Sequence, residues 1–277
     1  MSDISLYLKA VGPKAWGSSL ICNYCGVDTQ SYGPTGFCSN CESMTAGSRA
    51  SLTNRDAELL QALNSINGYL GAADFANAAK MYDQLSAKYK DPGFTYASGI
   101  LHIKWSNAAV SKLDYNLPGY MEQNAQYVDL SNSLISKSKS MFYNVIELYK
   151  LDQAHQDAPN YVHTVFLCHL KLGDHRQAER SAKRLSELKV QDAADYSALA
   201  LGASLGKYDE VLKATSSMAA SGRLGVNAAF YAAMAMFNKR KNREAMAIAK
   251  AIYPYLPKSR IDSFIRNVQR IESAALL

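Results

Sequence analysis

Four cysteines near the N-terminus have the residue type and spacing to bind a metal ion. They form two Cys-x2-Cys pairs that are separated by twelve residues, namely Cys22, Cys25, Cys38 and Cys41. Two residues between thiolates allow a tight turn to direct both sulfur atoms at one ion, and two such pairs supply four soft ligands with tetrahedral geometry. We therefore predict one structural Zn2+, because four protein ligands leave no coordination position open for catalysis.

Small turn residues accompany these cysteines. Gly26 directly follows the second cysteine and suits the left-handed backbone that such a turn needs, while Gly33-Pro34 and Gly36 mark the tip of a hairpin. Over residues 18–46 the pattern resembles the zinc-ribbon family, which implies a small β-rich module that contacts nucleic acid or protein and folds only with its metal. A redox-active dithiol is the alternative, and it explains one Cys-x2-Cys pair but not two at this distance.

No pattern typical of an enzyme accompanies the cysteines. The sequence has no glycine-rich phosphate loop, no Gly-x-Ser-x-Gly elbow and no His-Glu-x-x-His helix. Four histidines and the fifth cysteine lie close together in sequence, but not at the i, i+4 spacing of metal ligands on one helix; they are His155, His163, Cys168, His169 and His175. We interpret Cys168 as a small buried residue and predict that the protein is not an enzyme.

The positive charge of the chain is concentrated in its last segment. Residues 239–272 contain nine basic and three acidic residues, and this excess of +6 equals the formal net charge of the whole chain. Residues 1–50 are neutral overall, whereas a ribbon that binds duplex nucleic acid normally carries a basic excess. The residues that could contact RNA or an acidic partner are Lys239, Arg240, Lys241, Arg243, Lys258, Arg260, Arg266 and Arg270. The alternative is that the run from Lys239 to Arg243 is an ordinary solvated turn.

A helix–turn–helix pattern recurs along the rest of the chain. Aligning the sequence on the small residues Ala78, Ala178, Val211 and Ala245 places a short turn before each of them. The last three positions are 33 and 34 residues apart, and the first lies 100 residues before the second. The period of about 34 residues resembles that of the tetratricopeptide repeat (TPR) family over residues 55–277. The family's tryptophan at the start of the first helix and its closing proline are not regularly present here.

The periodicity of apolar residues predicts a mostly α fold, a TPR-like solenoid of antiparallel helix pairs behind a small β ribbon. The predicted segments are an N-terminal arm (1–17), the ribbon (18–46), a linker (47–54), the helical repeats (55–257) and a capping helix (258–277). We expect the helices of the repeats near residues 54–67, 74–90, 94–113, 120–150, 160–172, 175–189, 192–205, 208–221, 226–238 and 242–255. Two breaks are predicted between them, at Asp91-Pro92-Gly93 and at Leu117-Pro118-Gly119.

These features together favour a binding or scaffold protein that holds a protein partner in the groove of its helical repeats, with the ribbon as a second contact module. An RNA-associated factor, acting for example on a ribosome or polymerase, is the alternative, and a self-assembling structural protein is a weaker one. No run approaches the length of about 18 apolar residues needed to span a membrane. The first residues lack the basic start and apolar core of a secretory signal, so we expect a cytoplasmic protein.

Overall fold

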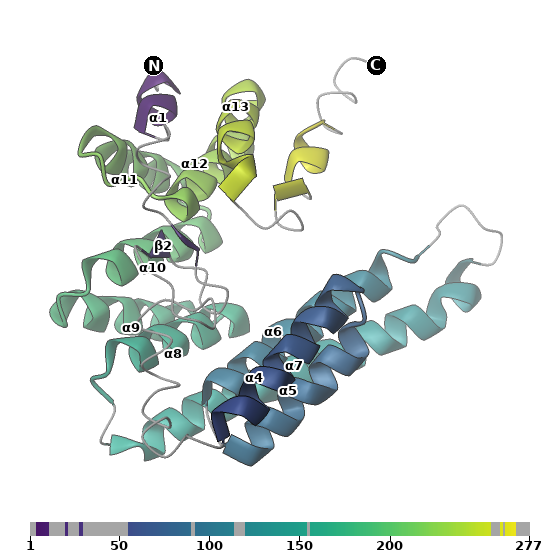
Figure 1. The fold of residues 1–277 in the computed structure, drawn as a ribbon. Coiled ribbons are helices and arrows are strands. Elements are labelled where there is room, and N and C mark those ends of the chain that lie inside the picture. Colours follow the sequence, from purple (N-terminus) through teal and green to yellow (C-terminus); the bar gives the residue numbers. More distant parts are fainter. Residues whose placement is uncertain are drawn as a thin grey trace. The chain divides into compact units, whose positions relative to one another are not determined.

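The computed structural model describes residues 4–10, 20–21, 28–29, 55–89, 92–113, 120–153, 156–255, 261–262 and 264–269. These residues are mostly helical, which confirms the mostly α fold class (Figure 1). The chain divides into two compact units, one made of Ser43–Ala178 and the other of Met1–Glu42 together with Glu179–Leu277. The four N-terminal cysteines lie outside the described residues.

The Ser43–Ala178 unit is a set of antiparallel helices that pack in chain order. Its helices are α4 (Arg55–Gly71), α5 (Phe75–Tyr89), α6 (Pro92–Val110), α7 (Tyr120–Leu151) and α8 (Pro159–Leu172). Each helix contacts the next one, and the largest interface joins α6 to α7. Leu59, Ile66 and Leu85 are among the buried side chains that α4 and α5 contribute to a common core with α6.

The bounds of two helices in this unit differ from the prediction. The segment Asp91-Pro92-Gly93 was expected to lie between helices, but Pro92 is the first residue of α6. Proline is compatible with the first turn of a helix because the N–H group it lacks would have no partner there. The first helix continues to Gly71, four residues beyond the predicted end at Asn67.

A polar seam joins α6 to α7. On α7, Asn124, Ser131 and Ser138 recur every seven residues and are all buried, so they lie on one face of the helix. The Ser131 hydroxyl lies 2.8 Å from the hydroxyl of Ser106 on α6, and this hydrogen bond satisfies both groups away from water. Small side chains at these positions let the two helices approach closely.

Helix α7 approaches α6 closely at Gly99. A Cβ atom added there would lie 2.7 Å from Cε1 of Phe142, whose ring is only 1% exposed. The ring is rigid and enclosed, so it cannot move aside cheaply. We therefore expect Gly99→Ala to lower the free energy of unfolding by roughly 1–2 kcal/mol, despite alanine's better helix propensity.

The matched control for this substitution is Gly68 on α4, which is exposed and has no atom within 4 Å of an added Cβ. Gly68→Ala is expected to raise the free energy of unfolding by about 0.5–1 kcal/mol through helix propensity alone. Urea denaturation followed by circular dichroism measures both. An equal effect of the two substitutions would contradict the close contact with Phe142.

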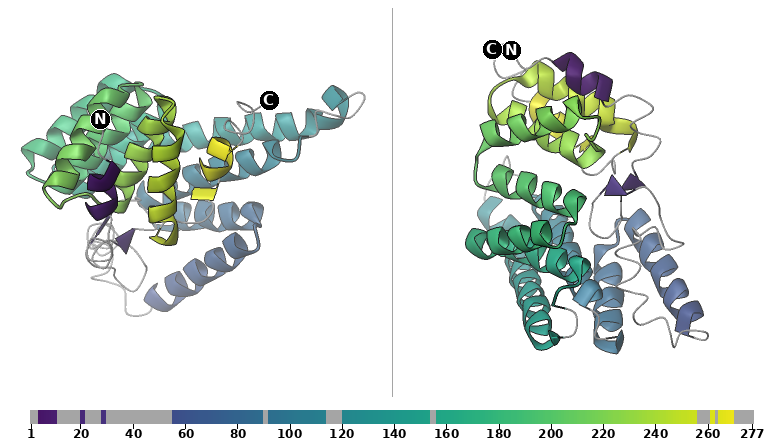
Figure 2. Two further views of the ribbon diagram at one scale, coloured as in Figure 1. Left: turned by 90° about the horizontal axis from the view of Figure 1, so that it is seen from above. Right: turned by 90° about the vertical axis from the view of Figure 1, so that its left-hand side faces the viewer.

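The second unit contains α1 (Ile4–Ala10), β1 (Leu20–Ile21), β2 (Asp28–Thr29), α10 (Gln191–Ser204), α11 (Tyr208–Ala220), α12 (Val226–Asn238), α13 (Asn242–Ile252) and the 3-10 turn η3 (Tyr253–Tyr255). The chain enters this unit within α9 (His175–Glu187). Helices α10 to α13 pack in sequence, and α10 also contacts α12 (Figure 2). Beyond η3, residues 261–262 and 264–269 are helical; Ile261 and Val268 are fully buried there, and Phe264 packs edge-on against Phe230.

The four aligned turns share one backbone geometry. The residue five positions before each aligned small residue has a positive φ angle: 56° at Ala73, 75° at Gly173, 71° at Gly206 and 59° at Arg240. The next N–H group donates to the carbonyl five residues earlier, from Asp74 to Tyr69, Asp174 to His169, Lys207 to Gly202 and Lys241 to Met236, at 2.8–2.9 Å. This is the Schellman arrangement that ends a helix. The aligned residues themselves are all at most 2% exposed.

Two of these left-handed positions allow a reciprocal test. Gly173 adopts its φ of 75° without strain. Ala73 has a φ of 56°, which is unfavourable for a residue that carries a Cβ atom. We expect Gly173→Ala to lower the free energy of unfolding by about 1 kcal/mol and Ala73→Gly to raise it by about 0.5–1 kcal/mol. Chemical denaturation measures both, and changes of the same sign would show that the φ angles do not control these positions.

Within the described part of the chain, none of the helices is both long and apolar enough to cross a membrane. The 32-residue helix α7 has the length but carries charged and polar residues throughout.

Candidate binding surfaces

The predicted metal ligands Cys22, Cys25, Cys38 and Cys41 all lie outside the described residues. Two described strands stand directly beside the first pair in the sequence. Strand β1 pairs with β2 in antiparallel register, with Leu20 opposite Thr29 and Ile21 opposite Asp28. Residues 22–27, which include Cys22 and Cys25, therefore connect two paired strands.

The basic turn between α12 and α13 is less positive than its sequence suggests. The Lys239 ammonium group donates to both carboxylate oxygens of Asp209, at 2.8 and 2.7 Å. Asp209 lies thirty residues earlier, at the start of α11, so the sequence did not reveal this pair. Arg240 and Arg243 are exposed, and neither has an ion pair with another described residue. The turn thus presents two unpaired guanidinium groups rather than four free cations.

Of the other four predicted basic residues, the structure describes one. Arg266 is exposed on the C-terminal helical segment, while Lys258, Arg260 and Arg270 lie outside the described residues. Lys241 is half-buried at the end of the turn. In the described part of the chain, the predicted basic patch is therefore limited to the turn from Lys239 to Arg243 and to Arg266.

A pair of tyrosines lies where α10 and α12 meet. The rings of Tyr196 and Tyr231 are 5.6 Å apart in an edge-to-face arrangement, and the Tyr231 hydroxyl donates to the Tyr196 hydroxyl at 3.4 Å. Both side chains are half-buried, as is Met234 one turn further along α12. Aromatic and sulfur-containing side chains that remain partly exposed are typical of protein contact surfaces. No pattern in the sequence marks these residues.

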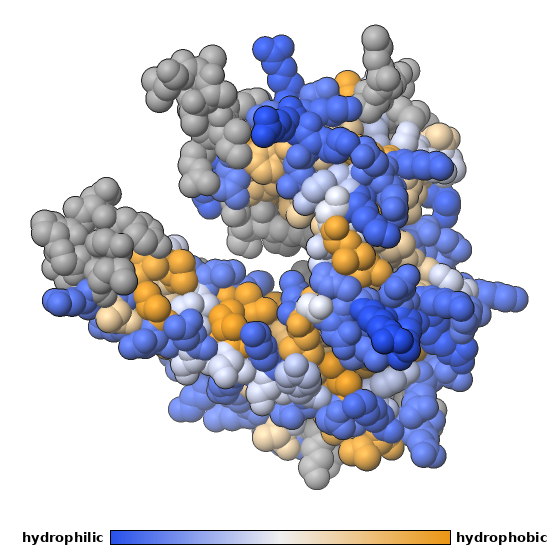
Figure 3. All heavy atoms as spheres, turned by 180° about the vertical axis from the view of Figure 1, so that it is seen from behind, coloured by the Kyte–Doolittle hydropathy of each residue, from blue (hydrophilic) through white to orange (hydrophobic). Residues whose placement is uncertain are grey.

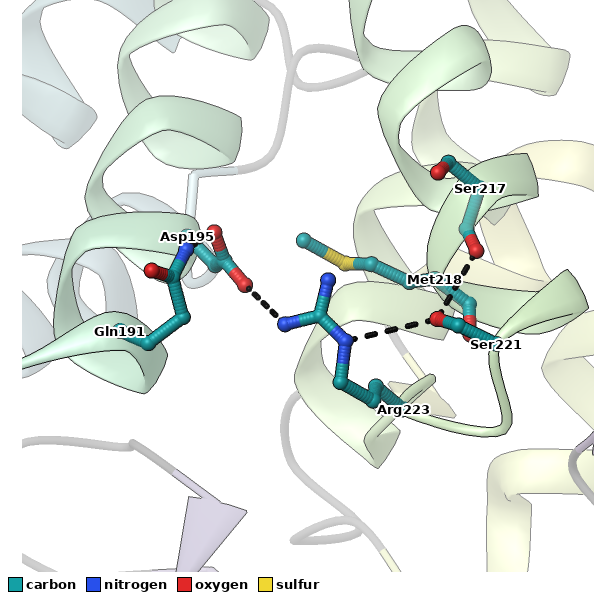
Figure 4. Close-up of polar contacts among 6 residues, drawn as sticks. All are labelled: Gln191, Asp195, Ser217, Met218, Ser221 and Arg223. Carbon is teal, nitrogen blue, oxygen red and sulfur yellow. Dashed lines mark hydrogen bonds and ion pairs between the residues drawn. The ribbon is translucent and has the colours of Figure 1, made fainter.

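An ionic cluster fixes the connection between α11 and α12 to the start of α10 (Figure 4). One carboxylate oxygen of Asp195 accepts from Arg223 Nη1 at 3.2 Å, and the other accepts from Gln191 Nε2 at 2.6 Å. Arg223 Nε also donates to the Ser221 hydroxyl at 3.4 Å. Each carboxylate oxygen of Asp195 accepts a hydrogen bond from another side chain, so this cluster stabilises the connection.

Three of the predicted histidines and Cys168 lie within the described residues, and His155 lies outside them. Among the described residues, no three His, Cys, Asp or Glu side chains lie close enough together to hold an ion. His169 Nδ1 is 3.5 Å from Asp174, which also accepts a hydrogen bond from the N–H group of Gln177 at the start of α9. Burial lowers the pKa of His169, the nearby Asp174 carboxylate opposes this effect and Lys150 adds to it, so the ring is neutral at pH 7.

Cys168 is fully buried in α8, as the sequence predicted. Burial raises the pKa of its thiol well above the ordinary value, and the thiolate is the reactive form. We expect alkylation of Cys168 in the native chain to be slower than in denaturant by more than about 100-fold, because reaction requires local unfolding. Mass spectrometry of the Cys168 peptide after timed alkylation measures this ratio, and rapid labelling of the native chain would contradict the burial.

A second polar cluster lies where α5, α6 and α7 meet. Asp83 accepts from the Ser98 hydroxyl at 2.5 Å and from the Lys137 ammonium group at 2.7 Å. His102 Nδ1 lies 2.8 Å from the Ser98 carbonyl oxygen, which can only accept, so this nitrogen carries the proton. The histidine therefore cannot take a proton from Ser98 through Nδ1. Both Ser98 and His102 are at most 1% exposed, so these hydrogen bonds lie away from water.

Exposed apolar side chains occur on the hairpin of α6 and α7. Val110, Val128 and Leu130 are exposed near the α6–α7 connection, and Figure 3 shows apolar side chains along this hairpin. Val128 and Leu130 are two residues apart on α7, so they point to different sides of the helix rather than along one stripe. Scattered exposure of this kind is normal for a protein surface.

Comparison with known proteins gives no match: no family model, no curated protein and no solved structure is significantly similar to this chain.

Proposed function

We propose that this protein is a non-enzymatic binding or scaffold protein, in which TPR-like helix pairs hold a protein partner and a zinc ribbon provides a second contact. The observation that carries this proposal is the repeated helix–turn–helix geometry, which places equivalent helices of successive pairs, α10 and α12, side by side. Stacked pairs of this kind produce extended surfaces suited to binding a peptide or a helix.

The tyrosine pair is the described part of this surface that best fits a protein contact. Tyr196 and Tyr231 present rigid rings with a polar tip, and their mutual hydrogen bond orders them before any partner arrives. Ordering before binding reduces the entropy lost on association. Half-exposed Met234 adds an adaptable apolar neighbour.

The zinc ribbon is supported by two independent features. The first is the spacing of Cys22, Cys25, Cys38 and Cys41, which matches the requirement of a tetrahedral four-sulfur site. The second is the antiparallel pairing of β1 and β2 on either side of residues 22–27. Two paired strands that flank a Cys-x2-Cys segment are compatible with binding of one ion by both thiolates.

The partner is tested by affinity capture from the cells that produce the protein, with and without nuclease. We expect a bound protein that resists nuclease and moderate salt, and whose capture falls at least about tenfold in the variant Tyr196→Leu/Tyr231→Leu. Leucine preserves apolar packing, and thermal denaturation verifies that the variant is folded. The control is Tyr143→Leu on α7, where the tyrosine is 58% exposed. Equal loss in the control would rule out the tyrosine pair as the contact.

An RNA-associated role is the second candidate, favoured by the exposed and unpaired Arg240 and Arg243. It predicts RNA in the captured material, lost on nuclease treatment, and an affinity that falls steeply with salt because bound phosphates release counterions. Arg240→Glu/Arg243→Glu should remove this binding, while Lys139→Glu on exposed α7 should not. Binding that is independent of salt would exclude this role.

A further inference from the structure

The N-terminal helix α1 packs onto the surface formed by α11 and α13, within one compact unit. Helices α11 and α13 are the second helices of successive pairs. Tyr7 takes part in this contact; it is 2% exposed and belongs to the same hydrophobic cluster as Val211 and Ala245. By contrast, Leu8 on the same helix is 39% exposed.

The site beneath Tyr7 suits a phenol side chain. The Tyr7 hydroxyl donates to the Leu212 carbonyl at 3.1 Å and lies 3.2 Å from the Thr215 hydroxyl, which is fully buried. Thr215 also donates to the Val211 carbonyl within its own helix, so it remains satisfied without a ligand. An apolar surface with a carbonyl and a hydroxyl group at its base is complementary to tyrosine, which has an apolar ring and a polar hydroxyl group.

We propose that the surface of α11 and α13 is a binding site for a short helix anchored by one tyrosine, and that α1 fills this site as a releasable ligand carried on the same chain. The seven residues of α1 are too few to form a stable helix in water by themselves. Helix formation is therefore coupled to docking, and Tyr7 is the buried anchor among the α1 side chains that the structure describes.

Attachment to the same chain explains how a weakly binding helix stays docked on its site. A segment carried on the same chain as its site has an effective concentration on the order of 1 mM. A free peptide with a dissociation constant of about 100 µM would then be about 90% docked when carried on the same chain. Release of α1 exposes the site for another helix with the same chemistry.

The test uses a labelled peptide with the sequence of residues 1–12 and the full-length chain. In the chain carrying Tyr7→Ala the site is empty, and we expect the peptide to bind with a dissociation constant on the order of 100 µM. The unchanged chain should bind it about tenfold more weakly, because its own α1 competes. A peptide with Tyr7→Phe should bind about three- to tenfold more weakly than the original, and one with Leu8→Ala within about twofold.

Several outcomes would overturn the proposal. One is equal peptide affinity for the two chains, and another is no binding to either. Hydrogen exchange of the unchanged chain provides a second measurement should Tyr7→Ala fail to fold. The amides of α1 are then expected to exchange faster than those of α11, and exchange of α1 only at the rate of global unfolding would show that it is not released. If the unchanged chain were a dimer and the chain with Tyr7→Phe a monomer, α1 would dock on a second copy instead.

Discussion

Metal analysis of the purified chain is expected to find about one zinc ion, and Cys22→Ser is expected to remove it. A serine hydroxyl is a much poorer ligand than a thiolate, and three remaining sulfur atoms hold the ion weakly. The free energy of zinc binding to such segments is on the order of 10 kcal/mol and is also their folding free energy. This is therefore the largest effect that we expect from any single substitution. Native mass spectrometry gives the stoichiometry.

The matched control for zinc loss is Cys168→Ala, which removes the fully buried fifth cysteine and should leave one zinc in place. Lowering the pH should release the ion from the unchanged chain, because protons compete with it for the four thiolates. A metal-free chain with two reducible disulfides at these positions would support the redox alternative. Full zinc content in Cys22→Ser would show that the predicted ligand set is wrong.

Enlarging an aligned small residue is expected to have the second largest effect. Ala78 is fully buried in α5, which packs against both α4 and α6. Because protein interiors are close-packed, three additional carbon atoms at this position must displace a neighbouring helix. We expect Ala78→Leu to lower the free energy of unfolding by about 2–3 kcal/mol, as measured by urea denaturation.

The same helix supplies the control, since Ala76 is exposed two residues before Ala78. Ala76→Leu should change the free energy of unfolding by no more than about 0.5 kcal/mol. Ala245 occupies the equivalent position in α13 and is also fully buried, so Ala245→Leu should resemble Ala78→Leu. If all three substitutions had similar small effects, the aligned residues would not mark close approaches between helices.

The turns were predictable because the chain must reverse at each of them. In each of the four turns, the left-handed residue that ends one helix lies five positions before the buried small residue of the next helix. Glycine marks this conformation at Gly173 and Gly206, but Ala73 and Arg240 adopt it without glycine. Aligning the sequence on the buried small residue therefore located turns that a search for glycine would miss.

The polar seam between α6 and α7 was not predictable from periodicity. An apolar stripe identifies the buried face of a helix, but Ser106 and Ser131 are buried because each supplies the other's hydrogen bond. The sequence around a serine does not identify the residue to which it will form a hydrogen bond. Lys239 illustrates the same limit in the candidate site, since it is paired with Asp209 of an adjacent helix rather than free.

The sequence by itself determined the helical class, the positions of the aligned turns and the burial of Cys168, because these depend on local backbone preference and on the spacing of apolar residues. Only the tertiary structure decided which polar groups are paired and where α1 docks. Tyr7 meets Leu212 and Thr215 across more than 200 residues of chain. Contacts at such separation depend on how helices pack, and no local pattern of residues records them.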